Sequence, residues 1–229
     1  MAFTQLTKEQ AKEKVTELVQ AFKDNIEQYK LSTYKEAQVR KEFIDPLFNA
    51  LGWDVSNENK NSGQYQDVVN EDAIKIGGNT KAPDYSFRIG GTRIFFVEAK
   101  KPSVKIKDDP EPAFQLRHYA WNSNISISIL TDFEDIAVYD CRIKPNPKDN
   151  SSVARILIIN FENLLQDFDK LWDVFSKEAV LRGSFDRYVE SSKGKKGTSE
   201  VDNEFLKEIE GWRDNFAKNI ALRNPKLSI

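Results

Sequence analysis

Two strand-like runs that flank Gly90–Gly91 constrain the fold of this chain more than any other feature. DYSFRI and TRIFFVEAK are rich in β-branched and aromatic residues, and a glycine pair between such runs indicates a β-hairpin. The hairpin follows Pro83–Asp84 and ends in Glu98–Ala99–Lys100. The sequence therefore predicts two carboxylates and one ammonium at one end of a hairpin.

The length of the hairpin loop decides whether the two carboxylates share a face. Glu98 and Lys100 lie on the same face whatever the partner strand does, because side chains alternate along a strand. A two-residue loop would set Asp84 opposite Val97, whereas a three-residue loop, Gly90–Thr92, sets Asp84 opposite Glu98. We predict the three-residue loop, because it gathers the apolar side chains on one face. That face comprises Tyr85, Phe87, Ile89, Phe95, Val97 and Ala99.

Paired carboxylates at the end of a strand favour a cation site. Two like charges opposite each other repel, and Mg²⁺, which prefers hard oxygen ligands, would reverse that repulsion. Lys100 would act first as a point charge beside a phosphate. The alternative is a solvated strand whose alternating charges have no function. The apolar run FFV argues against it, since a strand buried on both faces has no structural reason to end in Glu-Ala-Lys.

The N-terminal quarter of the chain predicts two amphipathic helices. The first is expected over residues 7–30, where Thr7 and Gln10 can form a capping box. The second is expected to begin at Thr33, where Glu36 completes another capping box. Pro46 should kink or break this second helix.

The remaining patterns predict an α/β core with a helical C-terminal extension. A short helix is expected over residues 112–121, and ISISIL, DIAVYD and VARILII are expected strands. Helical periodicity returns after Asn160, followed by a linker over residues 191–199 and an amphipathic helix over residues 201–224. We therefore expect a core of residues 1–160 and an extension of residues 161–229.

Composition excludes several classes of protein. Among the 229 residues, 39% are apolar and 31% are charged, as in ordinary globular proteins. No apolar run approaches the roughly 20 residues of a membrane helix, and no secretory signal is visible. We therefore expect a cytoplasmic protein that does not associate with a membrane. A lone Cys141 excludes an intramolecular disulfide, and the single His118 excludes a histidine-rich zinc site. The net charge of −2 requires that any nucleic-acid-binding charge be local.

The hairpin resembles the signature of the PD-(D/E)xK nuclease superfamily. Pro83–Asp84, thirteen intervening residues and Glu98–Ala99–Lys100 match it. The resemblance implies that Asp84 and Glu98 are metal ligands and that Lys100 is the catalytic lysine. It also implies a restriction-endonuclease-like core, in which helices flank a central mixed β-sheet, and Mg²⁺ as the cofactor, with Mn²⁺ as a substitute.

Two further elements extend the resemblance. Gln115 and Tyr119 look like the Gln-x₃-Tyr element of one branch of the superfamily, and their spacing puts both on one helix face. They would contact the DNA backbone or position the lysine; the alternative is that they only pack. Glu36 matches the helix-borne acid that often completes the metal site; the alternative is that it only caps its helix.

The flanking segments resemble the N-terminal cleavage region of fused type IIG restriction–modification enzymes and of the type I R subunit. They include FIDPLFNALGW, EAKKP and LTDFEDIAVYD. The resemblance implies double-stranded DNA as the substrate and further restriction–modification domains or subunits, for methylation and specificity, as partners. No glycine-rich cofactor loop and no Asn-Pro-Pro-aromatic motif is present, so we expect no methylation by this chain.

The expected activity is Mg²⁺-dependent hydrolysis of DNA phosphodiesters, with target specificity supplied by other domains. One alternative is a catalytically silent, nuclease-like module that binds DNA or a partner subunit. Another is an exonuclease or junction resolvase, which shares the site and differs in substrate. The basic residues Lys101, Lys105 and Lys107 are either a solvated run or a track for DNA phosphates.

Overall fold

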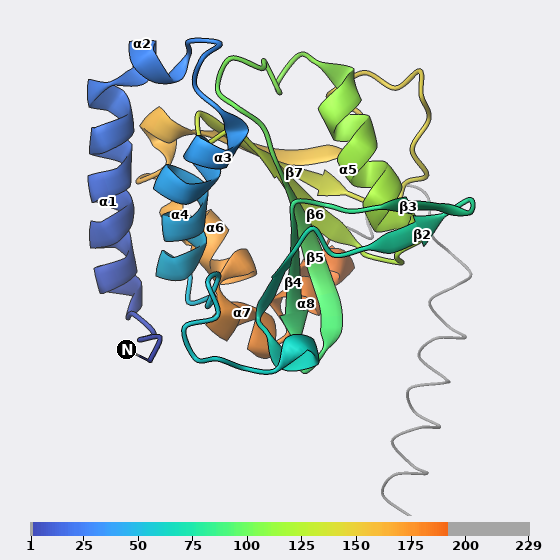
Figure 1. Cartoon of the computed structure of the whole chain (residues 1–229), viewed down its shortest axis with the longest axis horizontal. Helices are drawn as coiled ribbons and strands as arrows, with labels where there is room; N and C mark the ends of the chain where they lie inside the picture. Colours follow the sequence, from blue (N-terminus) through green and yellow to red (C-terminus); the bar gives the residue numbers. More distant parts are fainter. Residues whose placement is uncertain (1, 192–229) are drawn as a thin grey trace, which may run out of the picture. The chain divides into compact units, whose positions relative to one another are not determined.

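The computed structural model describes residues 2–191 of the chain (Figure 1). The chain forms two compact units, Met1–Arg187 and Tyr188–Ile229, and the first contains every element of the candidate site. The linker expected over residues 191–199 lies outside the described residues except for its first residue, and the helix expected over residues 201–224 lies wholly outside them. The division into functional domains at residue 160 stays a prediction.

A six-stranded mixed sheet runs through the first unit in the order β1-β4-β5-β6-β7-β8. Its strands are β1 (Val68–Asn70), β4 (Tyr85–Ile89), β5 (Thr92–Ala99), β6 (Ile127–Thr131), β7 (Asp135–Asp140) and β8 (Arg155–Asn160). Only β5 and β6 are parallel, and the crossover between them contains helix α5 (Pro110–Asn122). A separate hairpin, β2 (Ile74–Ile76) with β3 (Asn79–Lys81), lies between β1 and β4 in the chain. The expected central mixed sheet is confirmed.

The helices lie on both faces of this sheet (Figure 1). On one face α5 packs on an apolar cluster that includes Phe96, Leu116 and Leu130. On the other face Phe87 stacks on Phe95 with ring centroids 4.3 Å apart, and residues of α4 (Asp45–Ala50) and α6 (Phe168–Phe175) pack on this pair. The remaining α-helices of the described residues are α1 (Lys8–Asp24), α2 (Ile26–Tyr29), α3 (Glu36–Val39), α7 (Lys177–Leu181) and α8 (Ser184–Ser191), with 3₁₀ turns at Gly63–Tyr65 and Phe161–Asn163.

The N-terminal helices differ in part from the expected ones. The capping box of Thr7 and Gln10 is confirmed, but the helix ends at Asp24 and a separate turn, α2, follows Asn25. The predicted helix start at Thr33 is wrong, because α3 begins at Glu36 after an extended Lys35. The backbone N–H of Lys35 donates to Gln38 Oε1, so the cap lies two residues further along the chain than expected.

The predicted break at Pro46 is confirmed as a π-helical turn, Arg40–Ile44, in front of α4. Pro46 has no N–H, and in a regular helix its ring would clash with the carbonyl four residues earlier. In the wider turn the Asp45 N–H donates to the Arg40 carbonyl oxygen instead. Arg40 is the first residue of this turn.

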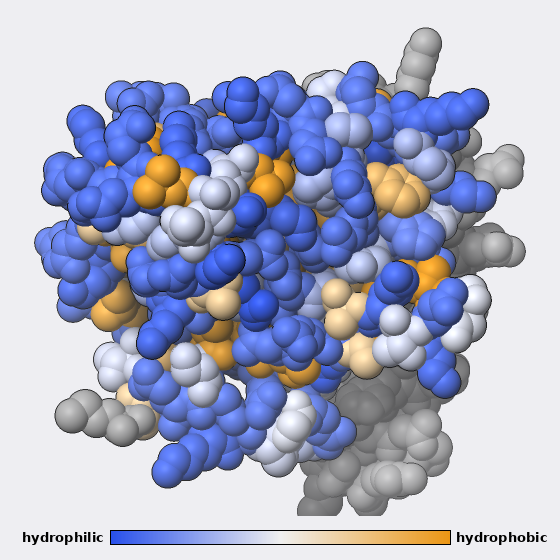
Figure 2. Space-filling view, turned by 45° about the horizontal axis from the view of Figure 1, so that its top comes forward, coloured by the Kyte–Doolittle hydropathy of each residue, from blue (hydrophilic) through white to orange (hydrophobic). Residues whose placement is uncertain are grey.

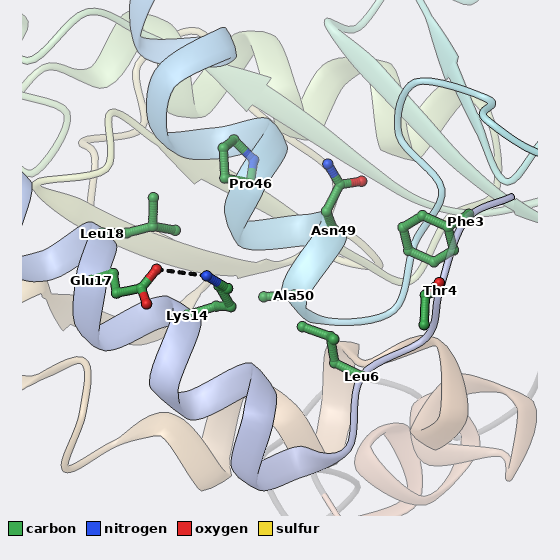
Figure 3. Close-up of a pocket in the computed structure, with 9 residues that line it drawn as sticks. All are labelled: Phe3, Thr4, Leu6, Lys14, Glu17, Leu18, Pro46, Asn49 and Ala50. Atoms are coloured by element: carbon green, nitrogen blue, oxygen red, sulfur yellow. Dashed lines mark hydrogen bonds and ion pairs between the residues drawn. The ribbon is translucent and has the colours of Figure 1, made fainter. Parts of the chain in front are cut away.

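The surface is predominantly hydrophilic on the face drawn in Figure 2, where hydrophobic residues reach the surface in small separate groups. A cavity of about 380 Å³ between the N-terminal segment, α1 and α4 contains the apolar side chains Phe3, Leu6 and Leu18 and none of the predicted site residues (Figure 3). None of the helices within residues 2–191 combines the length and apolar character that a membrane crossing requires.

Candidate active site

The β4–β5 hairpin brings Asp84 level with Glu98, although by another route than expected. The predicted three-residue loop is wrong: Ile89 pairs with Thr92 across a two-residue loop. Both loop glycines have positive φ, 55° and 86°, as a tight hairpin turn requires. A bulge then shifts the register by one residue, because Arg88 pairs with Arg93 but Phe87 pairs with Phe95.

This bulge restores the predicted register. Tyr85 pairs with Val97, so Asp84, which directly precedes β4, is level with Glu98 at the end of the hairpin. The apolar face that motivated the prediction is present, since Tyr85, Phe87, Phe95 and Val97 are all buried. The register was therefore predicted correctly, but the extra residue lies in the bulge of β5 and not in the hairpin loop.

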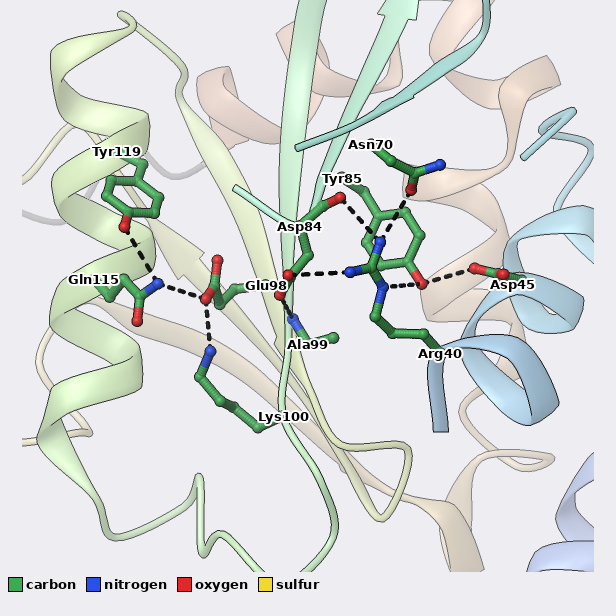
Figure 4. A network of polar contacts seen from close by, with 10 residues as sticks. All are labelled: Arg40, Asp45, Asn70, Asp84, Tyr85, Glu98, Ala99, Lys100, Gln115 and Tyr119. Carbon is green, nitrogen blue, oxygen red and sulfur yellow. Dashed lines mark hydrogen bonds and ion pairs between the residues drawn. The ribbon is translucent and has the colours of Figure 1, made fainter. Parts of the chain in front are cut away.

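Asp84 is held by a backbone amide and by an arginine (Figure 4). Its Oδ2 accepts a 2.7 Å hydrogen bond from the Ala99 N–H, and its Oδ1 lies 3.3 Å from Arg40 Nη1. Arg40 lies over the Tyr85 ring, 4.6 Å from its centroid, and donates to the Tyr85 hydroxyl at 3.1 Å. That hydroxyl donates in turn to Asp45 Oδ1 at 2.7 Å. The position of Asp84 is thus coupled to the π-helical turn that carries Arg40.

Glu98 is the most deeply buried of the predicted site residues, with 2% of its surface exposed. Its Oε1 accepts hydrogen bonds of 2.6 Å from both Lys100 Nζ and Gln115 Nε2. Its Oε2 is buried and accepts no hydrogen bond from any residue in the described range 2–191. A buried carboxylate oxygen without a donor is costly unless something else binds it.

Helix α5 supplies the two polar residues expected from the sequence. Asp109 caps it by accepting from the Glu111 N–H, and Pro110 occupies the first turn, where a missing N–H costs nothing. Gln115 and Tyr119 lie one turn apart on the same face, and Gln115 Nε2 is 3.3 Å from the Tyr119 hydroxyl oxygen. Their predicted position on one helix face is confirmed, and the contact of Gln115 with Glu98 is an additional finding; their part in catalysis stays a prediction.

Burial and like charge disfavour ionisation of Glu98. Burial, followed by the charge of Asp84, raises the pKa of Glu98 from 4.5 to about 7, although Lys100 opposes this shift. For Lys100, burial would lower the pKa, but attraction to Glu98 and the hydrogen bond between them outweigh burial and raise the pKa above 10.5. Lys100 is therefore a cation at neutral pH, which agrees with its expected role as a point charge.

Glu36 lies at the edge of this charged cluster. As the first residue of α3 it is half-buried, and it does not complete the capping box expected with Thr33. Burial raises the pKa of Glu36, while the nearby Lys100 and Arg40 charges lower it. Electrostatic coupling to Lys100 is consistent with the proposed third acid; a role as metal ligand stays a prediction.

Asp84 and Glu98 are the two predicted acids that lie level with each other at the end of the hairpin. Within residues 2–191 no three histidine, cysteine, aspartate or glutamate side chains are grouped closely enough to hold a metal ion together. Mg²⁺ is often bound by one or two carboxylates, with waters and substrate phosphates completing its shell. Two adjacent carboxylates are therefore compatible with Mg²⁺ but not with a fully protein-made site.

Sequence reasoning missed Arg40 and Asn70. Arg40 Nη2 donates to Asn70 Oδ1 at 3.2 Å, so one guanidinium joins the π-helical turn, β1 and Asp84. The signal that could have found Arg40 is its position four residues after Glu36, which suits one face of a helix.

The predicted basic run lies in the loop between β5 and α5. Lys105 and Lys107 line a cavity of about 450 Å³ together with the acidic residues Asp132 and Asp135. Lys107 Nζ lies 3.8 Å from Asp135 Oδ1, so part of this positive charge is already compensated. Contact with DNA phosphates stays a prediction for this run.

Comparison with known proteins identifies the relatives of the chain. Residues 66–147, which contain five of the six predicted site residues, match the family of the type I restriction enzyme R protein N terminus. The type II restriction enzyme and methyltransferase RM.Eco57I of Escherichia coli is 38% identical over 204 residues, which are 88% of this chain and 20% of that protein. The chain thus spans about a fifth of the length of this relative.

No solved structure matches the chain. The match over residues 66–147 covers the segment from β1 to just beyond β7, which includes the hairpin and α5. The chain is therefore homologous to one part of a type II restriction enzyme and methyltransferase and, over residues 66–147, to the N terminus of the type I restriction enzyme R protein.

Proposed function

We propose that this chain is the Mg²⁺-dependent endonuclease domain of a restriction–modification enzyme, with a PD-(D/E)xK active site in a restriction-endonuclease-like fold. The observation that carries the proposal is the cluster at the end of β5. Asp84 and Glu98 are level with each other, and the Lys100 ammonium donates to Glu98 at 2.6 Å. Clusters of groups with perturbed pKa values are typical of active sites.

The residues fit Mg²⁺. Glu98 Oε2 is a buried oxygen without a donor among the described residues, and a cation is the partner that would offset its cost. Asp84 is the second carboxylate, and its Oδ2 is oriented by the Ala99 N–H. Asp84 and Glu98 would hold the ion, and Glu36 is the proposed third acid. When bound, Mg²⁺ would polarise a phosphate oxygen and lower the pKa of water.

Lys100 provides positive charge for the reaction. In hydrolysis a water oxygen bonds to phosphorus while one P–O ester bond breaks, which leaves a phosphate monoester and a hydroxyl group. Negative charge accumulates on the non-bridging oxygens, and the buried Lys100 ammonium can donate hydrogen bonds to them. Its raised pKa suits this role and does not suit a general base.

Gln115 and Tyr119 support the carboxylate. Gln115 Nε2 donates to the same Glu98 oxygen as Lys100, which fixes the carboxylate and directs Oε2 toward the proposed cation. The Tyr119 hydroxyl is 3.3 Å from Gln115 Nε2 and limits the rotation of the amide. These contacts hold the acid in place before substrate arrives.

The substrate in this proposal is double-stranded DNA in the cytoplasm. RM.Eco57I is named as both a restriction enzyme and a methyltransferase, and this chain aligns with a fifth of it. We infer that methylation and target specificity belong to other domains or subunits, which are the partners of this chain. The nuclease domain alone should cleave weakly and without sequence preference.

Plasmid cleavage tests the proposal. The purified chain should nick or linearise supercoiled plasmid in Mg²⁺ or Mn²⁺ and not in EDTA. Asp84→Ala and Lys100→Ala should each lose at least about 100-fold in rate. Activity of either variant equal to that of the parent would refute the assigned chemistry. Metal-independent DNA binding without any cleavage would favour a catalytically silent docking module. Cleavage assays on end-labelled linear, circular and branched DNA distinguish an endonuclease from an exonuclease or a junction resolvase.

A further inference from the structure

The β2–β3 hairpin is an insertion that leaves the main sheet next to the candidate site. Strand β1 pairs with β4, and the chain between them departs after Asn70 and returns at Asp84. Its two strands pair only with each other, with Ile76 opposite Asn79 and Ile74 opposite Lys81. The hairpin projects past the end of α5 in Figure 1.

The base of the hairpin is anchored firmly to the core. Asp72 accepts hydrogen bonds of 2.7 and 2.8 Å from Arg93 on β5 and also pairs with Arg88 on β4. Ile74 is buried in the apolar cluster beneath α5, where Tyr119 also lies. An isolated two-stranded hairpin is marginally stable in water, so these contacts give it a defined orientation.

The outer part of the hairpin carries positive charge and polar groups. Lys75, Asn79, Thr80 and Lys81 are exposed, whereas residues 73–81 contain no aspartate or glutamate. Within residues 2–191 no ion pair engages Lys75 or Lys81. Within residues 2–191, no atom fills the space where a side chain at the turn residues Gly77 and Gly78 would stand.

The hairpin also lies close to the proposed chemistry along the chain. Lys81 is three residues before Asp84, and Tyr119, which shares the apolar cluster of Ile74, is one hydrogen bond from Gln115 and two from Glu98. The hairpin is thus packed on the same helix, α5, whose Gln115 contacts Glu98.

We propose that the β2–β3 hairpin is a DNA-binding element that contacts duplex DNA beside the cleaved phosphate. The inference rests on the proposed endonuclease function and adds the surface that holds the duplex. Lys75 and Lys81 supply phosphate contacts, and the side chains of Asn79 and Thr80 supply neutral hydrogen-bonding groups. A two-stranded β-ribbon has the width that the major groove admits.

The test measures binding of the full chain to a duplex oligonucleotide in EDTA, so that no cleavage occurs. Fluorescence anisotropy at several salt concentrations gives the slope of log K against log salt. The double variant Lys75→Gln/Lys81→Gln should make this negative slope less steep by about 2. It should also weaken binding at low salt by roughly 10- to 100-fold. Lys75→Arg/Lys81→Arg should restore both values, because it keeps the charge.

The matched control removes the same charge from α1. Lys12→Gln/Lys23→Gln changes two exposed lysines on the helix that Figure 1 draws at the opposite side from the hairpin, and it should leave the slope unchanged. A thermal melt of each variant verifies that it is folded. If the double variant Lys75→Gln/Lys81→Gln does not fold, the single variants Lys75→Gln and Lys81→Gln are tested instead.

The outcomes separate this inference from the proposed function. If the parent binds duplex and the hairpin variant has the same slope, the inference fails and the proposed nuclease stands. If binding depends on the hairpin but no metal-dependent cleavage is found, the inference stands and the proposed hydrolysis fails. A parent chain that binds no duplex at all would overturn the inference and remove DNA as the proposed substrate.

Discussion

Gln115 Nε2 donates a 2.6 Å hydrogen bond to Glu98 Oε1 and so joins helix α5 to the end of strand β5. Lys100 donates to the same oxygen, and no donor among the residues that the structure describes reaches the second oxygen of Glu98. Both donors therefore act on one side of the carboxylate and leave the other side for a ligand. The strand, the helix that follows it and the loop between them form one unit around a single buried acid.

Gln115→Leu should reduce cleavage without unfolding the chain. It removes one of two donors to a buried carboxylate, and a hydrogen bond to a charged group contributes about 1.5–3 kcal/mol. We expect kcat/KM for plasmid cleavage to fall by roughly 10- to 100-fold. Tyr119→Phe is the matched control, because it keeps the bond between Gln115 and Glu98, and it should cost less than about 5-fold. Equal activities of Gln115→Leu and the parent would contradict the role given to this contact.

Glu98→Gln should make the chain more stable at high pH when no metal is present. The pKa of Glu98 is raised by burial to about 7, so the folded chain retains a proton that the unfolded chain releases above about pH 4.5. Wild-type stability therefore falls as pH rises from about 4.5 to 7, by about 2–3 kcal/mol from this group. Glu98→Gln has no ionisable group at this position, so its free energy of unfolding should not show this fall between about pH 4.5 and 7.

Urea unfolding in EDTA at pH 5 and pH 8 measures the effect of Glu98→Gln. The exposed Glu13→Gln on α1 removes the same charge without burial and should follow the wild-type pH dependence. A wild-type chain and a Glu98→Gln variant whose stabilities change equally between the two pH values would show that burial does not penalise this carboxylate.

Alternation along β4 and β5 was enough to predict the register but not the loop. The register follows from apolar packing, because Phe87 and Phe95 must stack on the face that α4 covers. The loop and the bulge depend on one extra residue, Ile94, an apolar residue of a kind that is common anywhere in a strand and that therefore gives no signal of its own. Alternation of apolar side chains therefore indicates which face of a strand each residue occupies, but it does not indicate where a bulge adds an extra residue.

The proximity of Asp84, Glu98 and Lys100 was predictable because they lie within one hairpin, and that of Gln115 and Tyr119 because they lie within one helix. Arg40 was not predictable in the same way. Its contact with Asp84 joins residues 44 apart in the chain, and Arg40 is the first residue of the π-helical turn before Pro46. Contacts that depend on the packing of separate elements are beyond local pattern reasoning.

Arg40→Met should destabilise the chain. The Arg40 guanidinium donates to both the Tyr85 hydroxyl and Asp84 Oδ1, and the substitution leaves these partly buried groups without that donor. We expect a loss of about 2 kcal/mol in the free energy of unfolding, measured by urea titration. Lys41→Met changes an exposed neighbour and should stay within about 0.5 kcal/mol of the parent. Similar losses for both variants would argue against a special role of Arg40.

Asp72→Asn should weaken the anchor of the β2–β3 hairpin. Burial opposes ionisation of Asp72, but hydrogen bonds from Arg93 and Arg88 outweigh it and lower its pKa to about 2. The stabilisation is therefore complete above the ordinary value of 3.8 and is lost as pH falls toward 2. At pH 7 we expect Asp72→Asn to cost about 2 kcal/mol, because two arginines lose a charged partner.

Urea unfolding at pH 7 and an acid titration followed by circular dichroism measure the effect of Asp72→Asn. The difference between variant and parent should shrink as the pH approaches the pKa of Asp72. Glu71→Gln alters the adjacent exposed carboxylate and serves as the control. A difference that stays constant down to acid pH would mean that the carboxylate charge is not what stabilises the hairpin.

Divalent metal should stabilise the folded chain, and more so at pH 8 than at pH 6. A ligand that binds only the folded state stabilises it by RT ln(1 + [L]/Kd), or about 2.7 kcal/mol at a hundred times Kd. Glu98 must lose its proton to bind a cation, and its pKa of about 7 makes that loss cost free energy below neutrality. The shift of Tm with Mg²⁺ or Mn²⁺ at the two pH values measures this coupling. Asp84→Asn and Glu98→Gln should each abolish the shift, whereas an equal shift in Glu98→Gln would mean that the ion binds elsewhere on the chain.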